Sequence, residues 1–316
     1  MFEKKKKKAA AGSGFLGFTA VAVIFGILAI TLGACTQEPE KTQTAPVIDM
    51  VRIPAGVFTL GKELGTKGGG YHGNTPTSVA LSGYRIGKYQ VTQDQWRAVM
   101  GDNVNLINPN PSYFSSNPAS GEVQGRRPVE SVSWYEALVF CNRLSIKKGL
   151  RPAYWINGST DPAEWGAVPM SNSSEWNEVR VDPTSTGYRL PTEAQWEYAA
   201  KGGANQGAFT YSGSNDVNAV GWYDYNTVSQ ETHEVGKKQA NELGLYDMSG
   251  NVNEWCWDRH GNYMSKTDPD GPSSGSYRVL RGGSSIGDIV FLQVVCRNYG
   301  SPIDRGGDIG FRVALP

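Results

Sequence analysis

The sequence predicts an irregular α+β domain with modest helix and strand content, in which long loops run over a small twisted sheet. Three observations lead to this prediction. Residues 47–316 keep one texture, rich in Gly, Trp and Tyr, with no second linker and no repeat at a fixed period, which indicates one large domain. Three segments carry the signature of a helix start. Short strand-like segments are separated by long loops of Gly, Asn and Ser.

Each predicted helix begins with Ser or Thr followed three residues later by Glu or Gln, the pattern of a capping box. The three pairs are Thr92 with Gln95, Ser133 with Glu136, and Thr192 with Gln195. In the second helix one face carries only Trp134, Ala137, Leu138 and Cys141, which predicts a buried stripe. Cys141 is therefore interpreted as a small core residue rather than a nucleophile.

The strand signals are short and lie next to turn-forming residues. They occupy residues 50–60, 83–91, 276–281 and 310–315. Such short runs with long connections favour a small sheet over a β-sandwich or a doubly wound parallel sheet.

The N-terminus predicts export and lipidation. Five lysines at positions 4–8 precede an apolar run over about residues 15–32, the layout of a signal peptide. The run ends in Leu32-Gly33-Ala34-Cys35, which resembles a bacterial lipobox. We therefore expect cleavage of residues 1–34, lipidation of Cys35, a polar tether over residues 35–46, and a lipid-anchored protein on the outer surface of a bacterial membrane. An uncleaved helical anchor is the alternative, because the run is long enough to span a bilayer.

Charge and potential metal ligands argue against several function classes. Without residues 1–34 the chain has 25 lysines and arginines against 29 acidic residues, a net charge of −4, so no nucleic-acid partner is expected. Lipidation of Cys35 leaves three cysteines, an odd number that gives no complete disulfide framework. The three histidines lie far apart and no CxxC pair occurs, which argues against a histidine-rich catalytic metal site.

Six motifs, in this order along the chain, resemble the formylglycine-generating-enzyme family, whose fold is similar to that of C-type lectins. They span nearly all of the predicted mature chain, so the resemblance implies a C-type lectin-like fold of this subtype for residues 47–316. The motifs are MVRIPAGVFTLG (50–61), YQVTQDQW (89–96), RPVESVSWYEALVFCNRLS (127–145), YRLPTEAQWEYAAKGG (188–203), ELGLYDMSGNVNEW (242–255), and RGGS to GFRV (281–313).

The resemblance implies the fold but not the chemistry of the oxidase members. In those enzymes two cysteines beyond the Gly-Gly-Ser turn bind copper and form a mixed disulfide with a substrate peptide. Their places fall on Gly287 and Leu292, which offer neither a thiolate nor a metal ligand, and Cys296 stands alone without a resolving partner. We therefore expect no enzymatic activity. An enzyme of the same fold that uses a different site is the alternative.

The resemblance also implies one candidate cofactor, a structural calcium ion. Family members bind calcium near an Asp-x-x-Gly-Asn-x-x-Glu-Trp segment, which residues 247–255 match. Asp247 and Glu254 are the candidate ligands, since carboxylates and backbone carbonyls suit this cation. A polar turn held by internal hydrogen bonds is the alternative.

The end of the chain resembles the variable proteins of diversity-generating retroelements, which include spirochaete lipoproteins. There, a C-type lectin-like domain ends in a fixed frame, and the positions inside the frame are rewritten. The matching frame residues are Arg281-Gly282-Gly283-Ser284, Arg297, Pro302, Arg305 and Gly310-Phe311-Arg312-Val313. The family pattern has Trp where this chain has Ser285, which is a departure from it.

Amino-acid usage gives an independent indication of diversification. Mutagenesis at the adenines of asparagine codons does not reach Lys, Glu, Gln, Met or Trp when the third base is a pyrimidine, and residues 284–316 contain only Gln293 of these five types. We expect segment 285–308 to bind a macromolecular ligand, a protein, while an ordinary surface loop or a purely structural surface protein is the alternative. The candidate contact residues are Ile286, Gly287, Asp288, Phe291, Cys296, Asn298, Tyr299, Gly300, Ser301, Asp304, Gly306, Gly307 and Asp308.

Overall fold

The computed structural model describes residues 45–62, 75–205 and 209–316. The predicted signal peptide, Cys35 and all but the last two residues of the predicted tether lie outside the described residues. Where the described chain begins, Gln95 Nε2 donates to the carbonyl of Val47 at 2.9 Å and Lys148 Nζ to that of Ala45 at 3.2 Å. Across the three described ranges, no helix has the length and apolar character needed to cross a bilayer.

The three helices predicted from their first turns are present, and each begins with a complete capping box. They are α1 (Gln93–Met100), α2 (Trp134–Lys147) and α4 (Glu193–Ala200). The predicted stripe of α2, including Cys141, is buried. The shorter helices are α3 (Ser174–Asn177), α5 (Val217–Val220) and the 3₁₀ turns η1 (Gln124–Arg126), η2 (Pro162–Glu164), η3 (Gly203–Asn205), η4 (Val228–Gln230) and η5 (Ile289–Leu292).

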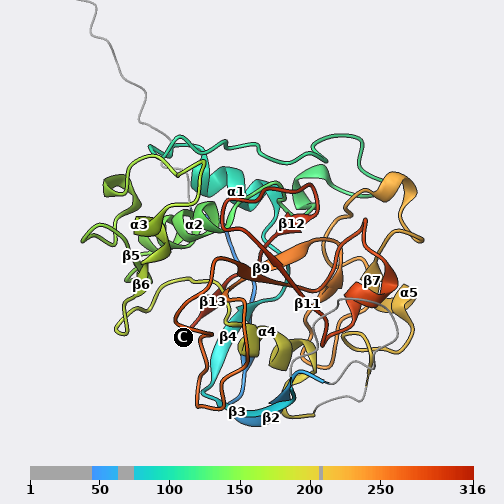
Figure 1. Cartoon of the computed structure of the whole chain (residues 1–316). Helices are drawn as coiled ribbons and strands as arrows, with labels where there is room; N and C mark the ends of the chain where they lie inside the picture. Colours follow the sequence, from blue (N-terminus) through green and yellow to red (C-terminus); the bar gives the residue numbers. More distant parts are fainter. Residues whose placement is uncertain (1–44, 63–74, 206–208) are drawn as a thin grey trace, which may run out of the picture. The chain divides into compact units, whose positions relative to one another are not determined.

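The strands of the described residues form a four-stranded sheet, a three-stranded sheet and three two-stranded pairs (Figure 1). The four-stranded sheet has the order β11-β10-β9-β12, in which β12 runs parallel to β9 and the other neighbours are antiparallel. Its strands are β9 (Asn253–Arg259), β10 (Arg278–Arg281), β11 (Arg297–Gly300) and β12 (Ile309–Gly310). The antiparallel three-stranded sheet joins β1 (Met50–Ile53), β4 (Tyr84–Gly87) and β13 (Ala314–Leu315). The pairs are β2 (Gly56–Leu60) with β3 (Thr77–Leu81), β5 (Tyr154–Trp155) with β6 (Arg180–Val181), and β7 (Gly221–Trp222) with β8 (Ser249–Gly250).

The strand expected over residues 50–60 is two strands in two different sheets. β1 pairs with β4, whereas β2 pairs with β3. Pro54 lies between them, and proline interrupts a strand because it has no backbone N–H to donate. The predicted fold class, an irregular α+β domain with modest helix and strand content, is confirmed.

The four-stranded sheet separates two hydrophobic clusters. Trp255 and Leu280 belong to the cluster that contains α1 and α2, whereas Cys256 and Val279 belong to the cluster that contains α4. Neighbouring residues of a strand point to opposite faces, so β9 and β10 serve both clusters. Figure 1 shows α1 and α2 on one side of this sheet and α4 on the other. One face of β10 therefore lies against α4.

Candidate ligand-binding site

The predicted variable segment, residues 285–308, begins just beyond β10 and returns along it as β11. Gly282 and Gly283 turn the chain with φ angles of +96° and +71°, which glycine adopts without strain. A Cβ atom at Gly283 would lie 2.9 Å from Leu292 Cδ1, so a larger residue has no room there. After η5 the chain pairs with β10 from Arg281 opposite Arg297 to Arg278 opposite Gly300. The segment is thus held at the edge of the central sheet.

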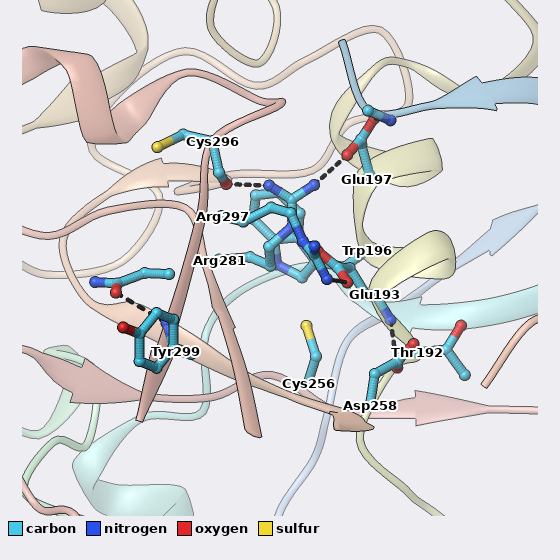
Figure 2. Close-up of polar contacts among 12 residues, drawn as sticks. Thr192, Glu193, Trp196, Glu197, Cys256, Asp258, Arg281, Cys296, Arg297 and Tyr299 are labelled. Carbon is cyan, nitrogen blue, oxygen red and sulfur yellow. Dashed lines mark hydrogen bonds and ion pairs between the residues drawn. The ribbon is translucent and has the colours of Figure 1, made fainter. Parts of the chain in front are cut away.

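Two frame arginines hold this hairpin against α4 (Figure 2). Arg297 Nε and Nη2 each donate to one carboxylate oxygen of Glu193 at 2.6 Å. Arg281 pairs with Glu197 and also donates to the carbonyl of Cys296, and its Nε lies 3.3 Å from Glu193 Oε1. All four charged side chains are buried. Charge-assisted and bidentate bonds of this kind fix the orientation of both partners.

The other two frame arginines anchor the segment's far end in the same way. Arg305 Nε donates at 2.9 Å to Glu136 Oε2, the oxygen that also accepts from the backbone at the start of α2. Arg312 Nε and Nη2 donate to the two oxygens of Glu254 at 2.6 and 2.7 Å. Every frame arginine therefore pairs with a glutamate that lies outside segment 285–308.

The candidate contact residues differ in exposure. Ile286 and Tyr299 are 43% and 40% exposed, and Asp288 and Asp304 are also exposed. Cys296 is buried, as is position 300, so these two contribute to the packing of the segment more than to its outer surface. The partly buried candidates are Gly287, Phe291, Asn298, Ser301, Gly306, Gly307 and Asp308.

Two aspartates stabilise turns of the segment, and a third ties its end to β9. Asp288 Oδ1 accepts the N–H of Val290 at 2.9 Å and caps η5. Asp304 Oδ2 accepts the N–H of Ser301 at 2.7 Å. Asp308 Oδ2 accepts from Asn253 Nδ2 at 3.1 Å. Side chains from within the segment thus shape its loops while the arginines fix its ends.

A neighbouring loop, residues 223–231, extends this surface, and sequence reasoning missed it. Thr227 Oγ1 donates to the carbonyl of Ser285 at 3.1 Å, which ties the loop to the start of the segment. Tyr225 and Val228 on this loop are 80% and 83% exposed. No local pattern marks them, because single apolar side chains on a protein surface are common; only the fold brings this loop beside segment 285–308.

The ring of Tyr299 packs against two aromatic rings outside the segment. Its ring centroid lies 5.0 Å from that of Tyr277 and 4.6 Å from that of His260. Tyr277 is 49% exposed. Tyrosines combine a large apolar area with a hydroxyl and are enriched at binding interfaces, so this aromatic cluster enlarges the candidate surface.

Residues 36–316 match the family model of the sulfatase-modifying factor enzyme 1-like domain. The chain belongs to this family. Treponema denticola variable protein 1 has a similar structure, with a TM-score of 0.75 and 42% identity over 86% of this chain and 96% of that one. Chaperone protein LppX of Paenibacillus barcinonensis is 37% identical over 92% of this chain and 97% of its own length. The formylglycine-generating enzyme of Thermomonospora curvata is 28% identical over 87% of this chain and 96% of its own. The predicted family and its fold are confirmed.

The cysteine pair of the family's oxidases has no counterpart in the described structure. Gly287 and Leu292 stand at the two positions, and Leu292 is fully buried. Cys296 is buried as a free thiol, and burial raises its pKa above the ordinary value, which disfavours the thiolate needed for metal binding or attack. These residues therefore do not suit the copper chemistry of the family's enzymes.

The candidate calcium ligands are part of a buried hydrogen-bond cluster. Gln90 Nε2 lies 3.0 Å from Glu254 Oε1 and 3.1 to 3.3 Å from the carbonyls of Asp247, Gly250 and Val252, which puts an amide where these oxygens converge. Arg312 holds both oxygens of Glu254. Burial raises the pKa of Asp247 to about 6. Because Gln90 and Arg312 already donate hydrogen bonds to these oxygens, the arrangement fits the alternative, a turn held by internal hydrogen bonds, better than it fits a calcium ion. Calcium binding stays a prediction for metal titration.

Proposed function

We propose that the protein is a non-catalytic binding protein, displayed at the bacterial surface by a lipid on Cys35, that contacts a protein ligand through segment 285–308. The observation that carries the proposal is that the residues that anchor the segment differ from the residues that are exposed on it. Its four framing arginines pair with glutamates outside it, whereas side chains such as Ile286, Asp288 and Tyr299 remain exposed. A surface whose ends are anchored by residues other than the exposed ones suits recognition.

The exposed side chains define the chemistry of the ligand. Ile286 and Tyr299 supply apolar anchors, and the exposed Tyr225 adds aromatic area beside them. Asp288 and Asp304 add negative charge at the same surface. We therefore propose a protein surface with an apolar patch flanked by lysine or arginine.

Site-specific crosslinking tests the binding surface. A photoreactive amino acid at position 299 should join the protein to a ligand, whereas the same group at position 104, which is exposed in a loop beyond α1, should not. Unlabelled wild-type protein should compete, and a variant with Ile286→Ser, Asp288→Asn and Asp304→Asn should compete poorly, because asparagine removes the negative charges while its amide oxygen can still accept the turn hydrogen bonds. Equal adducts from both positions, or equal competition by the variant, would contradict the proposal.

We also propose that a retroelement diversifies this segment. The similarity to Treponema denticola variable protein 1 and the scarcity of codon-inaccessible residue types over positions 284–316 support this. Sequencing of the flanking DNA should find a near copy of the codons for residues 281–316 beside a reverse-transcriptase gene, with asparagine codons at several varied positions. A flank without such a copy, or sister genes that differ equally at Arg297 and Phe311, would reject diversification.

The family relation supports one alternative, an enzyme that uses a site other than the missing cysteine pair. The formylglycine-generating enzyme of Thermomonospora curvata is a relative over most of the chain. Incubation of the purified protein with copper and a cysteine-containing peptide tests the oxidase activity directly. We expect no aldehyde product by mass spectrometry. Its formation would overturn the non-catalytic proposal.

A further inference from the structure

A cavity of about 550 Å³ lies outside segment 285–308 and has a cationic lining. Its walls come from the region of β6, from β9 and the start of β10, and from residues 264–273. The cations in the lining are Arg180, Arg259, Lys266 and Arg278. Glu178 and Asp270 are the carboxylates there, so cationic groups outnumber anionic ones by two.

Arg278 is the most unusual of these cations. It is 3% exposed, and its guanidinium carbon lies 3.6 Å from the ring centroid of Trp134. Its Nη1 donates to the carbonyl of Trp257 at 2.9 Å. Within the described residues no carboxylate forms an ion pair with it, although buried arginines ordinarily have one. Burying a cation without a neutralising partner is unfavourable in free energy, and a bound anion would offset this desolvation penalty.

A second arginine, Arg259, adds a like charge beside Arg278. Arg259 stands directly opposite Arg278 in the β9–β10 pairing. Its Nη1 and Nη2 donate to the carbonyls of Gly275 and Asn177 at 2.7 and 2.5 Å, and it too lacks an ion pair within the described ranges. Burial, followed by the charge of Arg259, lowers the pKa of Arg278 to about 9. Two adjacent like charges are therefore held together at one cavity wall.

The neighbouring carboxylates do not balance these charges. Asp270 pairs with Lys266, which neutralises both groups. Asp258 of β9 accepts the backbone N–H of Glu193 at the start of α4 at 2.7 Å, and burial raises its pKa to about 8, so it is largely protonated at neutral pH. Glu178 also lines the cavity, is exposed and forms no ion pair within the described residues, so with both lining carboxylates counted the lining keeps an excess of two positive charges.

We propose that this cavity is a second binding site, which takes an oxyanion such as a sulfate, phosphate or carboxylate group between Arg259 and Arg278. Guanidinium groups match the geometry of these anions because each can present two parallel N–H donors. Trp257 also lines the cavity and offers an apolar wall to whatever carries the anion. The lining belongs to the part of the chain outside segment 285–308, so the site serves every version of the variable surface.

Anion titration at constant ionic strength tests the site. Sodium sulfate, phosphate and acetate should each be compared with chloride by calorimetry and by the unfolding temperature of the protein. At least one of the three should bind saturably and raise the unfolding temperature, and their rank tells whether the natural group is tetrahedral or planar. Arg259→Gln should weaken that binding about tenfold or more, since a hydrogen bond to a charged group contributes about 1.5–3 kcal/mol.

Three further variants keep the test decisive. The pair Arg180→Gln and Lys266→Gln removes exposed cations of the lining, and it should weaken binding severalfold even if Arg259→Gln unfolds the protein. Arg52→Gln is the matched control, because Arg52 is exposed on β1 in the other sheet and should leave binding unchanged. Tyr299→Ser should also leave it unchanged, which separates this site from the proposed ligand surface. Absence of saturable binding by all three anions, or equal affinity in every variant, would overturn the proposal.

Discussion

Replacing Arg297 by Met should lower stability by about 3 kcal/mol, near the lower end of the 3–5 kcal/mol typical for breaking a buried ion pair. The substitution removes two hydrogen bonds of 2.6 Å to Glu193 and one of 2.9 Å to the carbonyl of Gly261. Glu193 keeps Arg281 Nε at 3.3 Å, which is why we expect the lower end of the range. For a domain of this size the loss corresponds to a fall of about 6–12 °C in the unfolding temperature.

Urea unfolding followed by tryptophan fluorescence measures this loss. Ile286→Met is the matched control, because position 286 is 43% exposed and surface substitutions usually stay within about 0.5 kcal/mol. Combining Arg297→Met with Glu193→Leu should cost less than the sum of the two single variants, since no unpaired carboxylate then remains. The reasoning fails if Arg297→Met costs no more than Ile286→Met, or if the two single losses simply add.

Three further predictions concern pH, metal and anchoring. Burial raises the pKa of Asp258 from 3.8 to about 8, so the folded state holds a proton that the unfolded state releases above about pH 4. The stability that this group contributes is therefore complete below about pH 4. It falls by about 1.4 kcal/mol per pH unit as the pH rises to about 8. Asp258→Asn should flatten that slope in urea unfolding, and a slope unchanged by the substitution would contradict the pKa. Calcium titration should leave the unfolding temperature unchanged if Gln90 and Arg312 already satisfy Glu254, whereas a rise would support a bound ion. Mass spectrometry should find the mature chain beginning at a lipid-bearing Cys35, and Cys35→Ala should yield a soluble or unprocessed form; an intact residue 1–34 segment in the membrane would support the helical anchor instead.

Features that depend on neighbours in the chain could be predicted from the sequence. The capping boxes at Thr92, Ser133 and Thr192 are complete in the structure because both partners of each box lie within four residues. The β1–β2 break at Pro54 was missed although the residue that causes it is visible in the sequence. The buried positions change phase there, from Ile53 in β1 to Phe58 and Leu60 in β2, and each strand then pairs with a different partner.

Features that depend on distant pairs could not be predicted. Each frame arginine donates to at least one backbone carbonyl, and each also pairs with the carboxylate of a glutamate that is distant in the sequence. Arg297 meets Glu193 across 104 positions and Arg305 meets Glu136 across 169. No local pattern in a single sequence identifies such partners. The cationic cavity could not be predicted for the same reason, since Arg259 and Arg278 become neighbours only through strand pairing.

The placement of Arg281 and Arg278 on β10 explains how one strand serves both proposed sites. Three positions apart, they point to opposite faces of the sheet, Arg281 toward α4 and Glu197, and Arg278 toward Trp134 and the cavity. Substitutions at exposed positions that bond no backbone group, such as Ile286, cost about 0.5 kcal/mol or less, whereas disturbing a framing pair costs several times more. Variation confined to the displayed side chains therefore leaves the anchoring pairs intact. Because Arg281 also holds β10 against α4, the proposed variation would leave in place the strand that lines the cavity.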